Sequence, residues 1–350
     1  MVTRSWLVLT DGYLETRNAK TAHGVLRYGR DPIAAVLDRD HAGRSLADVL
    51  PEMDRDAPIV GSFEEGRALG ATSLLLGVAT PGGWVPEHWR AWMLEAVQAG
   101  MEIANGLHRF LRDDEELVAT AAASGARLWD VREPPPGIPL CSGKALDAPQ
   151  RIVLTVGSDC AVGKMTASLE LAAAAEAAGR RAEFVATGQT GILIAGKGIA
   201  VDRVISDFVS GAAEQLVVDA DPAAEVLLVE GQGGLWHPAY SGVTLGLLHG
   251  CMPEVLILVH QAGRTAIEEP PGTVLPPLDV MVETYEAIAS VVRPCKVACV
   301  AVNCHGLSPG EAQAAVDEVA GATGLPAGDV MRGDGPLLWK AVAAALDSQG

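Results

Sequence analysis

A glycine-rich loop that contains a single lysine lies near the middle of the chain. Residues 157–164 read GSDCAVGK, directly after the apolar run Arg151–Val156 and directly before a helical pattern that begins at Lys164. Glycines allow the backbone N–H groups of such a loop to point inward, and a helix N-terminus and a lysine ammonium both attract anions. A strand, this loop and a helix in this order predict a phosphate-binding loop. We expect the cofactor contacts to come from Gly157, Ser158, Asp159, Cys160, Ala161, Val162, Gly163, Lys164, Met165 and Thr166, with Asn303 at the end of a later strand, where its side chain contacts a cofactor or caps a turn.

The loop departs from the common nucleotide-binding motif in two ways. Five residues separate its glycines instead of four, and Met165 stands where a Ser or Thr usually binds Mg²⁺. Methionine offers no oxygen to a hard cation. Thr166 lies about 100° further around the helix and is expected to contact phosphate instead. The loop therefore favours a ligand whose phosphates serve only as a handle, such as coenzyme A, over metal-assisted phosphoryl transfer from ATP with Mg²⁺.

Four side chains are candidates for the base of a proton transfer. Glu230 follows the run Glu225–Val229, at the edge where open α/β sheets bind ligands. It could take a proton, bind an ammonium group or order its own loop. His237 is a candidate because histidine is a common base in enzymes, although a loop histidine is often structural. Asp202 and Asp207 lie in DRVISDF, which we expect to be a helix whose acidic face is either catalytic or simply solvated.

Several polar and cationic side chains are candidates for holding a substrate. Gln189 and Thr190 stand in TGQTG after a predicted strand, where they suit a ligand contact, an oxyanion or a simple turn. Arg264 follows another strand and suits a carboxylate or a phosphate. Lys20 and Arg27 are seven residues apart and would share one helix face, on which they clamp a carboxylate or are solvated. The remaining candidates are Tyr240, which follows His237, and His108, which we expect in a cleft between the two halves of the chain.

The cysteines form no recognisable disulfide or metal pattern. The six include no CxxC pair, so we expect reduced thiols. Cys295, Cys299, Cys304 and His305 would be spread over both faces of a strand, and we predict no metal site. Cys160 lies in the phosphate loop near a helix N-terminus, which lowers a thiol pKa. It is either an acyl-carrying nucleophile or a small residue that fills the loop.

Strand-like runs alternate with helical patterns on both sides of a proline-rich break. The break, EPPPGIPLCSGKALDAPQ, spans 133–150 and is interpreted as a Pro/Gly linker between domains at 1–132 and 151–350. The alternation predicts two α/β domains with mainly parallel sheets. Expected strands are Trp6–Thr10, Ile33–Leu37, Pro58–Val60, Ser73–Val78, Met101–Ala104, Arg127–Asp130, Arg151–Val156, Glu183–Ala186, Glu225–Val229, Val255–Val259 and Lys296–Val302. Expected helices are Glu87–Ala99, Asp113–Ser124 and Lys164–Ala178.

Composition narrows the class of protein. The chain has 350 residues, of which 49% are hydrophobic and 20% charged, with a net charge of −18. No stripe of Lys and Arg offsets that charge, so we expect no nucleic-acid partner. The N-terminus lacks the pattern of a signal peptide, and no apolar run is long enough to span a membrane. We therefore expect a cytoplasmic homo-oligomer that has no membrane partner and acts on a small molecule.

Longer motifs resemble those of known families. The spacing GxDxxVGK and the segment VEGQGG at 229–234 resemble dethiobiotin synthetase, but over these two loops only. A likeness to the D-glutamate N-acetyltransferase-like P-loop family, long catalogued as a domain of unknown function, covers most of the chain. It is carried by AKTA at 19–22 with Arg27-Tyr28, GLH at 106–108, WDVR at 129–132, GSDCAVGKMT at 157–166, ATGQTG at 186–191, EGQG at 230–233 with HPAY at 237–240, and His260 with Gly263-Arg264.

This resemblance implies a Rossmann-like N-terminal domain, a P-loop C-terminal domain and transfer of an acetyl group from acetyl-CoA to an amine. Such a transfer needs a neutral amine, a base, donors for the oxyanion and, for an acidic amino acid, cations for its carboxylates. We therefore expect an N-acetyltransferase for D-glutamate or a similar amino acid. The alternatives are an ATP-dependent ligase or kinase, which a Ser or Thr in place of Met165 would favour, and a non-catalytic protein that binds nucleotide or CoA.

Overall fold

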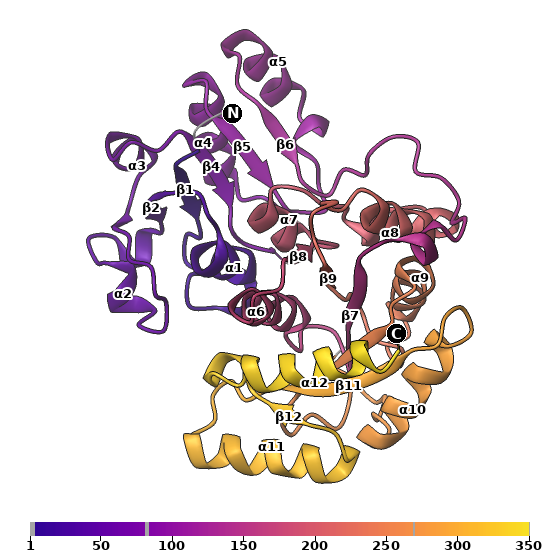
Figure 1. Cartoon of the computed structure of the whole chain (residues 1–350). Helices are drawn as coiled ribbons and strands as arrows, with labels where there is room; N and C mark the ends of the chain where they lie inside the picture. Colours follow the sequence, from indigo (N-terminus) through magenta and orange to yellow (C-terminus); the bar gives the residue numbers. More distant parts are fainter. Residues whose placement is uncertain (1–3, 81–83, 269, 350) are drawn as a thin grey trace. The chain divides into compact units, whose positions relative to one another are not determined.

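The computed structural model describes residues 4–80, 84–268 and 270–349. The chain divides into two compact units. Unit 1 comprises Met1–Glu133 with Gln189–Lys197, and unit 2 comprises Pro134–Gly188 with Gly198–Gly350. Each unit contains a parallel sheet of six strands, which confirms the predicted α/β class (Figure 1). In the described part of the chain, no helix has the length and apolar character needed to cross a membrane.

The sheet of unit 1 has the order β3-β2-β1-β4-β5-β6. The chain builds outward from β1 in one direction and then returns to β4 on its other side, so the loops after β1 and β4 diverge. In open α/β sheets this reversal is where ligands bind. The strands are β1 (Trp6–Leu9), β2 (Ile33–Leu37), β3 (Ile59–Val60), β4 (Ser73–Leu76), β5 (Glu102–Asn105) and β6 (Leu128–Asp130).

Helices cover both faces of this sheet. One face packs through Phe63 of α3 (Phe63–Ala68), Trp89 and Met93 of α4 (Glu87–Gln98), and Leu117 of α5 (Glu115–Ser124). Asp114 caps α5 by accepting from the backbone N–H of Leu117, so this helix begins later than predicted. Elsewhere in the unit, α1 (Lys20–Tyr28) and α7 (Gln189–Ala195) pack together, and α2 (Leu46–Val49) is a single turn.

The sheet of unit 2 has the order β12-β11-β10-β7-β9-β8. Its central strands are almost fully buried runs rich in Val, Leu and Ile, as the continuous apolar pattern predicted. The strand β7 lies between β10 and β9, so the loop that follows it faces the loops that follow both neighbours. The strands are β7 (Arg151–Gly157), β8 (Ala182–Val185), β9 (Val226–Val229), β10 (Val255–Gln261), β11 (Lys296–Asn303) and β12 (Ala327–Gly328).

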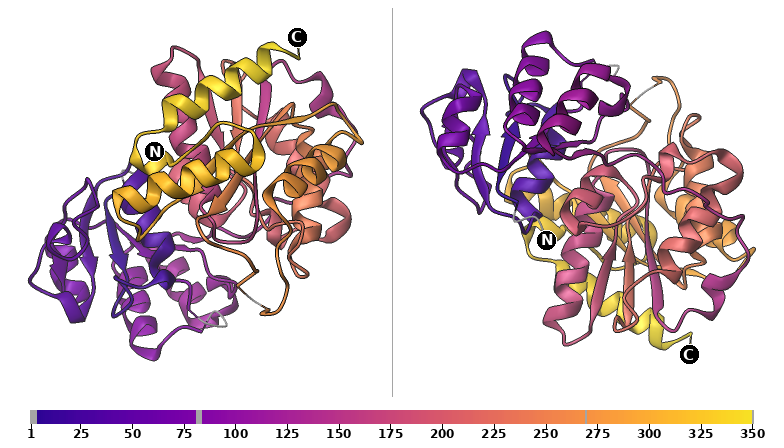
Figure 2. Two further views of the ribbon diagram at one scale, coloured as in Figure 1. Left: turned by 90° about the horizontal axis from the view of Figure 1, so that it is seen from below. Right: turned by 90° about the horizontal axis from the view of Figure 1, so that it is seen from above.

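Two sets of helices bury the two faces of this second sheet. On one face, α6 (Lys164–Ala177) packs beside α12 (Gly335–Asp347), with Leu171 and Trp339 in the core (Figure 1). The other face is covered by α8 (Val209–Val218), α9 (Ser241–Cys251), α10 (Leu278–Ala289) and α11 (Pro309–Thr323). Figure 2 shows α11 and α12 in yellow beside the sheet edge formed by β11 and β12.

One predicted helix is absent from the structure. The segment DRVISDF forms two separate 3₁₀ turns, Val201–Arg203 and Ser206–Phe208, and the predicted continuous helix is wrong. Val204 and Ile205 between the turns have extended backbones, with ψ of 140° and 137°. Two consecutive β-branched residues favour that conformation, because a helix restricts their side chains.

Candidate functional site

The phosphate loop connects β7 to α6 as predicted, and its backbone is unusual at two positions. Gly163, which precedes α6, has φ of +108°, a conformation that glycine adopts freely. Ala161 has φ of +54°, which costs a residue with a Cβ roughly 1–2 kcal/mol. Such strain persists only where the surroundings hold it, and it is common at ligand sites. The loop therefore has a shape that its neighbours impose.

Lys164 is buried and links the phosphate loop to the loop after β9. Its Nζ donates to the carbonyl oxygens of Asp159 and Gly233, each at 2.7 Å. Burial lowers the pKa of Lys164 to about 8, although the nearby charges of Cys160, Asp159 and Glu230 oppose that shift. The ammonium is thus positioned at the centre of the loop, as an anion site requires.

Asp159 and Arg264 form a buried ion pair beside the loop. Arg264 Nη1 donates to Asp159 Oδ2 at 2.6 Å, and the backbone N–H of Glu268 donates to the same oxygen at 3.1 Å. Asp159 Oδ1 accepts from the backbone N–H of Cys160 at 2.7 Å. The guanidinium of Arg264 also donates to Gln261 Oε1. Arg264, a predicted substrate contact, is therefore held by Asp159 of the loop and by Gln261 and Glu268.

Three further side chains brace the loop from neighbouring elements. His260 Nδ1 is hydrogen-bonded to Ser158 Oγ at 3.0 Å, and burial, together with Arg264, lowers the pKa of His260 to about 4. Tyr285 donates its hydroxyl to the carbonyl of Gly157 at 2.7 Å. Asn303, the predicted cofactor contact, donates to the carbonyl of Val162 at 3.1 Å, and its Oδ1 accepts from the backbone of His305 at 3.0 Å. In this structure Asn303 supports the loop and caps a turn.

Glu230 follows β9 directly and is almost fully buried. Its Oε2 accepts hydrogen bonds from the backbone N–H groups of Thr187 and Gly188, at 2.9 and 3.0 Å. Burial raises the pKa of Glu230 to about 7, against the opposing effect of those two hydrogen bonds and of Lys164. A carboxyl group that titrates near neutrality is suited to exchange protons at the working pH.

His237 is buried near the loop, and its tautomer is indicated by one hydrogen bond. Its Nδ1 accepts from the backbone N–H of Ala239 at 3.2 Å, so the neutral ring carries its proton on Nε2. Its ring lies against that of Tyr240, with centroids 4.6 Å apart, and Tyr240 is half exposed. In this tautomer His237 is a hydrogen-bond donor, and it would have to shift its proton before acting as a base.

Asp159, Cys160 and His237 come together in a small cluster. One ligand atom from each lies within 4.8 Å of the others. Two cations adjoin the cluster, since Arg264 pairs with Asp159 and the ammonium of Lys164 donates to its carbonyl. This environment suits an anion better than a divalent cation.

The other predicted site residues come from other segments of the chain. Asp202 and Asp207 are exposed on their 3₁₀ turns in unit 2. The predicted substrate contacts of unit 1 are distributed over two helices and a loop. Lys20 is exposed at the start of α1, Arg27 donates to the carbonyl of Glu52, Thr190 is hydrogen-bonded to Thr21 at 3.1 Å, Gln189 packs against Gly106, and His108 is exposed after β5.

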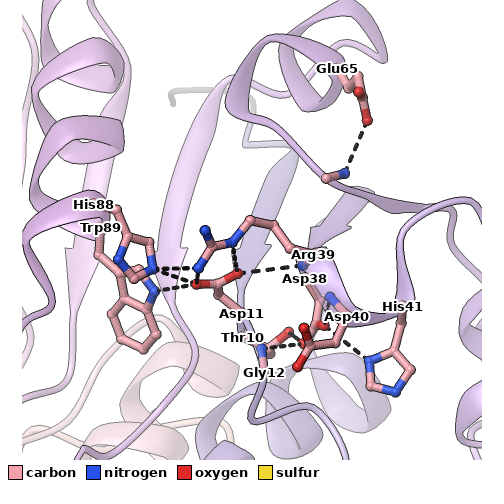
Figure 3. A network of polar contacts seen from close by, with 11 residues as sticks. Thr10, Asp11, Gly12, Asp38, Arg39, Asp40, His41, Glu65, His88 and Trp89 are labelled. Carbon is pink, nitrogen blue, oxygen red and sulfur yellow. Dashed lines mark hydrogen bonds and ion pairs between the residues drawn. The ribbon is translucent and has the colours of Figure 1, made fainter.

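A second polar network, in unit 1, was missed by the sequence analysis (Figure 3). Asp11 follows β1 with φ of +31° and accepts from Arg39 Nε and Nη2 at 2.7 and 2.8 Å. Trp89 Nε1 and His88 Nε2 lie 2.9 and 2.6 Å from Asp11 Oδ2. Asp38, which follows β2, accepts from Thr10 and Gly12 and holds His41. Two aspartates placed directly after neighbouring predicted strands were the available signal.

We expect Asp11 to contribute to stability in a pH-dependent way. Burial alone would raise the pKa of Asp11, but hydrogen bonds from Arg39, Trp89 and His88 outweigh it and hold the pKa at about 2. Because this is below the unfolded value of 3.8, the contribution is present above pH 4 and is lost as pH falls toward 2. Asp11→Asn should lower the free energy of unfolding by about 2 kcal/mol at pH 7, as measured by urea denaturation. Exposed Asp54→Asn is the control, and equal effects of the two variants would contradict the assignment.

Comparisons with known proteins cover nearly the whole chain. Residues 39–134 match a family model described as the Rossmann-like domain of DUF1611, a domain of unknown function, and residues 139–338 match the P-loop domain of DUF1611. A crystal structure of a DUF1611 family protein from Anabaena variabilis is 39% identical, covers 97% of this chain and 99% of its own, and superposes with a TM-score of 0.92.

Two curated relatives carry a functional name. A protein of Tritonibacter scottomollicae named D-glutamate N-acetyltransferase is 38% identical over 93% of this chain and 94% of its own length. A protein of the same name from a Pseudoalteromonas species is 38% identical over 77% of this chain and 81% of its own. The chain is thus similar to both along the two units, and not only in the phosphate loop.

Proposed function

The chain belongs to the DUF1611 family, and on that premise we propose that it is an N-acetyltransferase that moves the acetyl group of acetyl-CoA to the amine of an acidic amino acid such as D-glutamate. The observation that carries this proposal is the 38% identity, over 93% of the chain, to a relative named for that reaction. The chemistry of the phosphate loop is compatible with this proposal. Met165, directly after Lys164, offers no oxygen ligand for Mg²⁺, so the loop suits a phosphate that is held and not transferred.

In this proposal the phosphate loop holds a phosphate of CoA. Backbone N–H groups of residues 161–163, the N-terminus of α6 and the ammonium of Lys164 would neutralise it. Lys164 now donates to two carbonyl oxygens, so one of its three N–H groups remains available to a ligand without breaking either contact. The N–H of His237 adds a second donor near the loop.

We assign the proton transfer to Glu230, with His237 as a donor beside it. The amine must lose a proton as it attacks the thioester, and Glu230 has a pKa near 7 and lies at the carboxyl edge of the sheet. The pantetheine arm of CoA is about as long as four extended residues, roughly 14 Å, so the thioester can lie anywhere within that radius of the bound phosphate. Glu230 would act where the thioester lies beside the end of β9.

The reaction is tested directly by assaying acetyl transfer. Purified protein would be given acetyl-CoA with each acidic D- and L-amino acid, and then with neutral ones, while release of free CoA thiol is followed. We expect release with an acidic amino acid and an acetylated product one acetyl group heavier by mass spectrometry. Tight binding of acetyl-CoA with no release for any amine would instead support the non-catalytic alternative.

We expect the activity to be independent of divalent metal. Met165 occupies the position of the usual Mg²⁺ ligand and cannot coordinate that ion. Dialysis against EDTA should leave the rate of acetyl transfer unchanged, because neither binding of a held phosphate nor aminolysis of a thioester requires the metal. If chelation abolishes turnover and Mg²⁺ with ATP restores it, the ligase alternative that resembles dethiobiotin synthetase is correct.

A further inference from the structure

Unit 1 contains a cavity to which the proposed function assigns no role. It lies at the carboxyl edge of the sheet, where β4 ends at Leu76 and β5 ends at Asn105. Ligands of open α/β sheets bind at this edge. The volume of the cavity is about 330 Å³, at the lower end of the range found for small-molecule sites. Its position and its size therefore suit a small ligand.

Apolar side chains form much of the lining of this cavity. They come from β4, from α4 and the segment before it, from the loop after β5 and from α5, and they are Leu76, Val85, Met93, Phe110, Leu111 and Leu117. Leu76, Met93 and Leu117 also belong to the hydrophobic core of the unit, so packing fixes this part of the lining. A ligand that fills the cavity should therefore carry an apolar group.

Two buried polar side chains hold the loop after β5 in a defined shape. Asn105 is 1% exposed, donates to the carbonyl of Arg109 at 2.8 Å and accepts from the backbone N–H of Leu107 at 2.9 Å. Asp130 accepts from Asn105 and from the backbone N–H of Leu111, each at 2.8 Å. The backbone at Arg109 is thus positioned before a ligand binds, which lowers the entropy cost of binding.

An ion pair joins the two helices that contribute to the cavity. Arg90 of α4 donates to both carboxylate oxygens of Asp114, the N-cap residue of α5, at 2.7 and 3.0 Å. Arg90 also donates to Glu116 at 2.6 Å. These three groups therefore satisfy one another's charges, and ligand recognition has to come from other side chains of the lining.

Three other charged side chains line the cavity and have no partner within the chain. The side chains of Arg109, Asp113 and Glu115 are exposed, and they form no hydrogen bond or ion pair with any residue in the described part of the chain. The guanidinium of Arg109 can bind a carboxylate through two N–H groups. Asp113 and Glu115 can accept hydrogen bonds from an ammonium group. Charges of both signs beside an apolar surface match a zwitterion.

We propose that this cavity is a second small-molecule site, which binds a zwitterionic amino acid with an apolar side chain. Arg109 binds the carboxylate, Asp113 or Glu115 accepts from the ammonium group, and the side chain packs against the apolar lining. An acidic amino acid fits poorly, because Asp113 and Glu115 repel its second carboxylate. All the lining residues belong to unit 1, whereas the phosphate loop belongs to unit 2, and the proposal does not depend on acetyl transfer.

The first test compares leucine with two analogues that each lack one charge. Calorimetry on the full-length protein would use L- and D-leucine, 4-methylpentanoate, which lacks the ammonium group, and 3-methylbutan-1-amine, which lacks the carboxylate. We expect one leucine enantiomer to bind at least about tenfold more tightly than either analogue, because each analogue loses a charge-assisted contact. No binding of either enantiomer would overturn the proposal, and so would an amine that binds as tightly as leucine.

The second test uses substitutions in the cavity. Arg109→Ala should lower the affinity for leucine at least about tenfold, and Arg109→Lys should lower it less, because it keeps the charge and loses the two-pronged contact. Val85→Trp should block binding by filling the cavity from its half-buried wall. Arg30→Ala, at an exposed arginine of the same unit outside the lining, is the matched control. Wild-type affinity in Arg109→Ala and Val85→Trp would contradict the proposal.

The third test locates the ligand by NMR of methionine methyl groups labelled with ¹³C. Met93 lines the cavity, and Met165 follows the phosphate loop in unit 2. Leucine should shift the Met93 signal and leave that of Met165 unchanged, and glutamate should shift Met93 less than leucine does. A shift of Met165 alone, or an equal shift of Met93 with glutamate, would overturn the proposal. A protein that binds leucine in this way but acetylates no amine would contradict the proposed function and leave this inference standing.

Discussion

Glu230→Gln should lower kcat for acetyl transfer by roughly 10²–10⁴, because it removes a proton acceptor and leaves the backbone contacts of the side chain possible. The amide oxygen of the new residue can still accept from Thr187 and Gly188, as Glu230 Oε2 does. The fold should therefore persist. Steady-state kinetics with both substrates would measure it.

Two pH signatures accompany this substitution. In the wild type, the rate should rise as pH passes through about 7, where burial places the pKa of Glu230. Because this value is above the unfolded value of 4.5, stability is fully present below pH 4.5 and is lost as pH rises through 7. Glu230→Gln removes that loss. At pH 8 the free energy of unfolding of the variant should therefore be up to about 3 kcal/mol higher than that of the wild type.

The kinetic constants distinguish a base from a supporting group. Loss of a base lowers kcat, whereas loss of support for Lys164 mainly raises KM for acetyl-CoA. Glu225→Gln, at the opposite end of the same strand, is the matched control and should behave as wild type. His237→Ala made in parallel should weaken binding more than kcat if His237 acts as a donor. A Glu230→Gln enzyme with wild-type kcat would move the base elsewhere.

The strands and the phosphate loop could be predicted from sequence because their signals are local. Continuous apolar runs gave β7, β9, β10 and β11 to within one or two residues, and the glycines and lysine of GSDCAVGK specified the turn between a strand and a helix. Glu230 could be assigned to the carboxyl edge for the same reason, since an acidic residue directly after a buried parallel strand has few other places to lie.

The partners of the site residues could not be predicted, because they come from distant parts of the chain. Arg264 pairs with Asp159 across 105 residues, and nothing near either residue in sequence distinguishes that contact from binding a substrate carboxylate. The tautomer of His237 depends on one backbone N–H. Residues 189–197 belong to unit 1 although their neighbours in sequence belong to unit 2, a division that periodicity cannot reveal.

Lys164→Met should weaken acetyl-CoA binding by about ten- to a hundredfold, the effect of losing one charge-assisted contact of roughly 1.5–3 kcal/mol. Methionine keeps the buried stem and removes the charge, so the loop should retain its packing. Wild-type affinity should itself fall as pH rises above about 8, because burial lowers the pKa of Lys164 to that value and the neutral amine no longer attracts phosphate.

The same substitution should make the protein more stable at neutral pH, which separates a functional lysine from a structural one. The folded pKa of Lys164, about 8, is below the unfolded value of 10.5, so its contribution to stability is lost as pH falls through 8. Removing the charge should therefore raise the free energy of unfolding at pH 7 by up to about 3 kcal/mol. Loss of the two hydrogen bonds to Asp159 and Gly233 reduces this gain by their contribution to stability. Exposed Lys340→Met should change neither property. A Lys164→Met protein that binds acetyl-CoA normally in calorimetry would show that the loop does not hold the cofactor, whatever its stability.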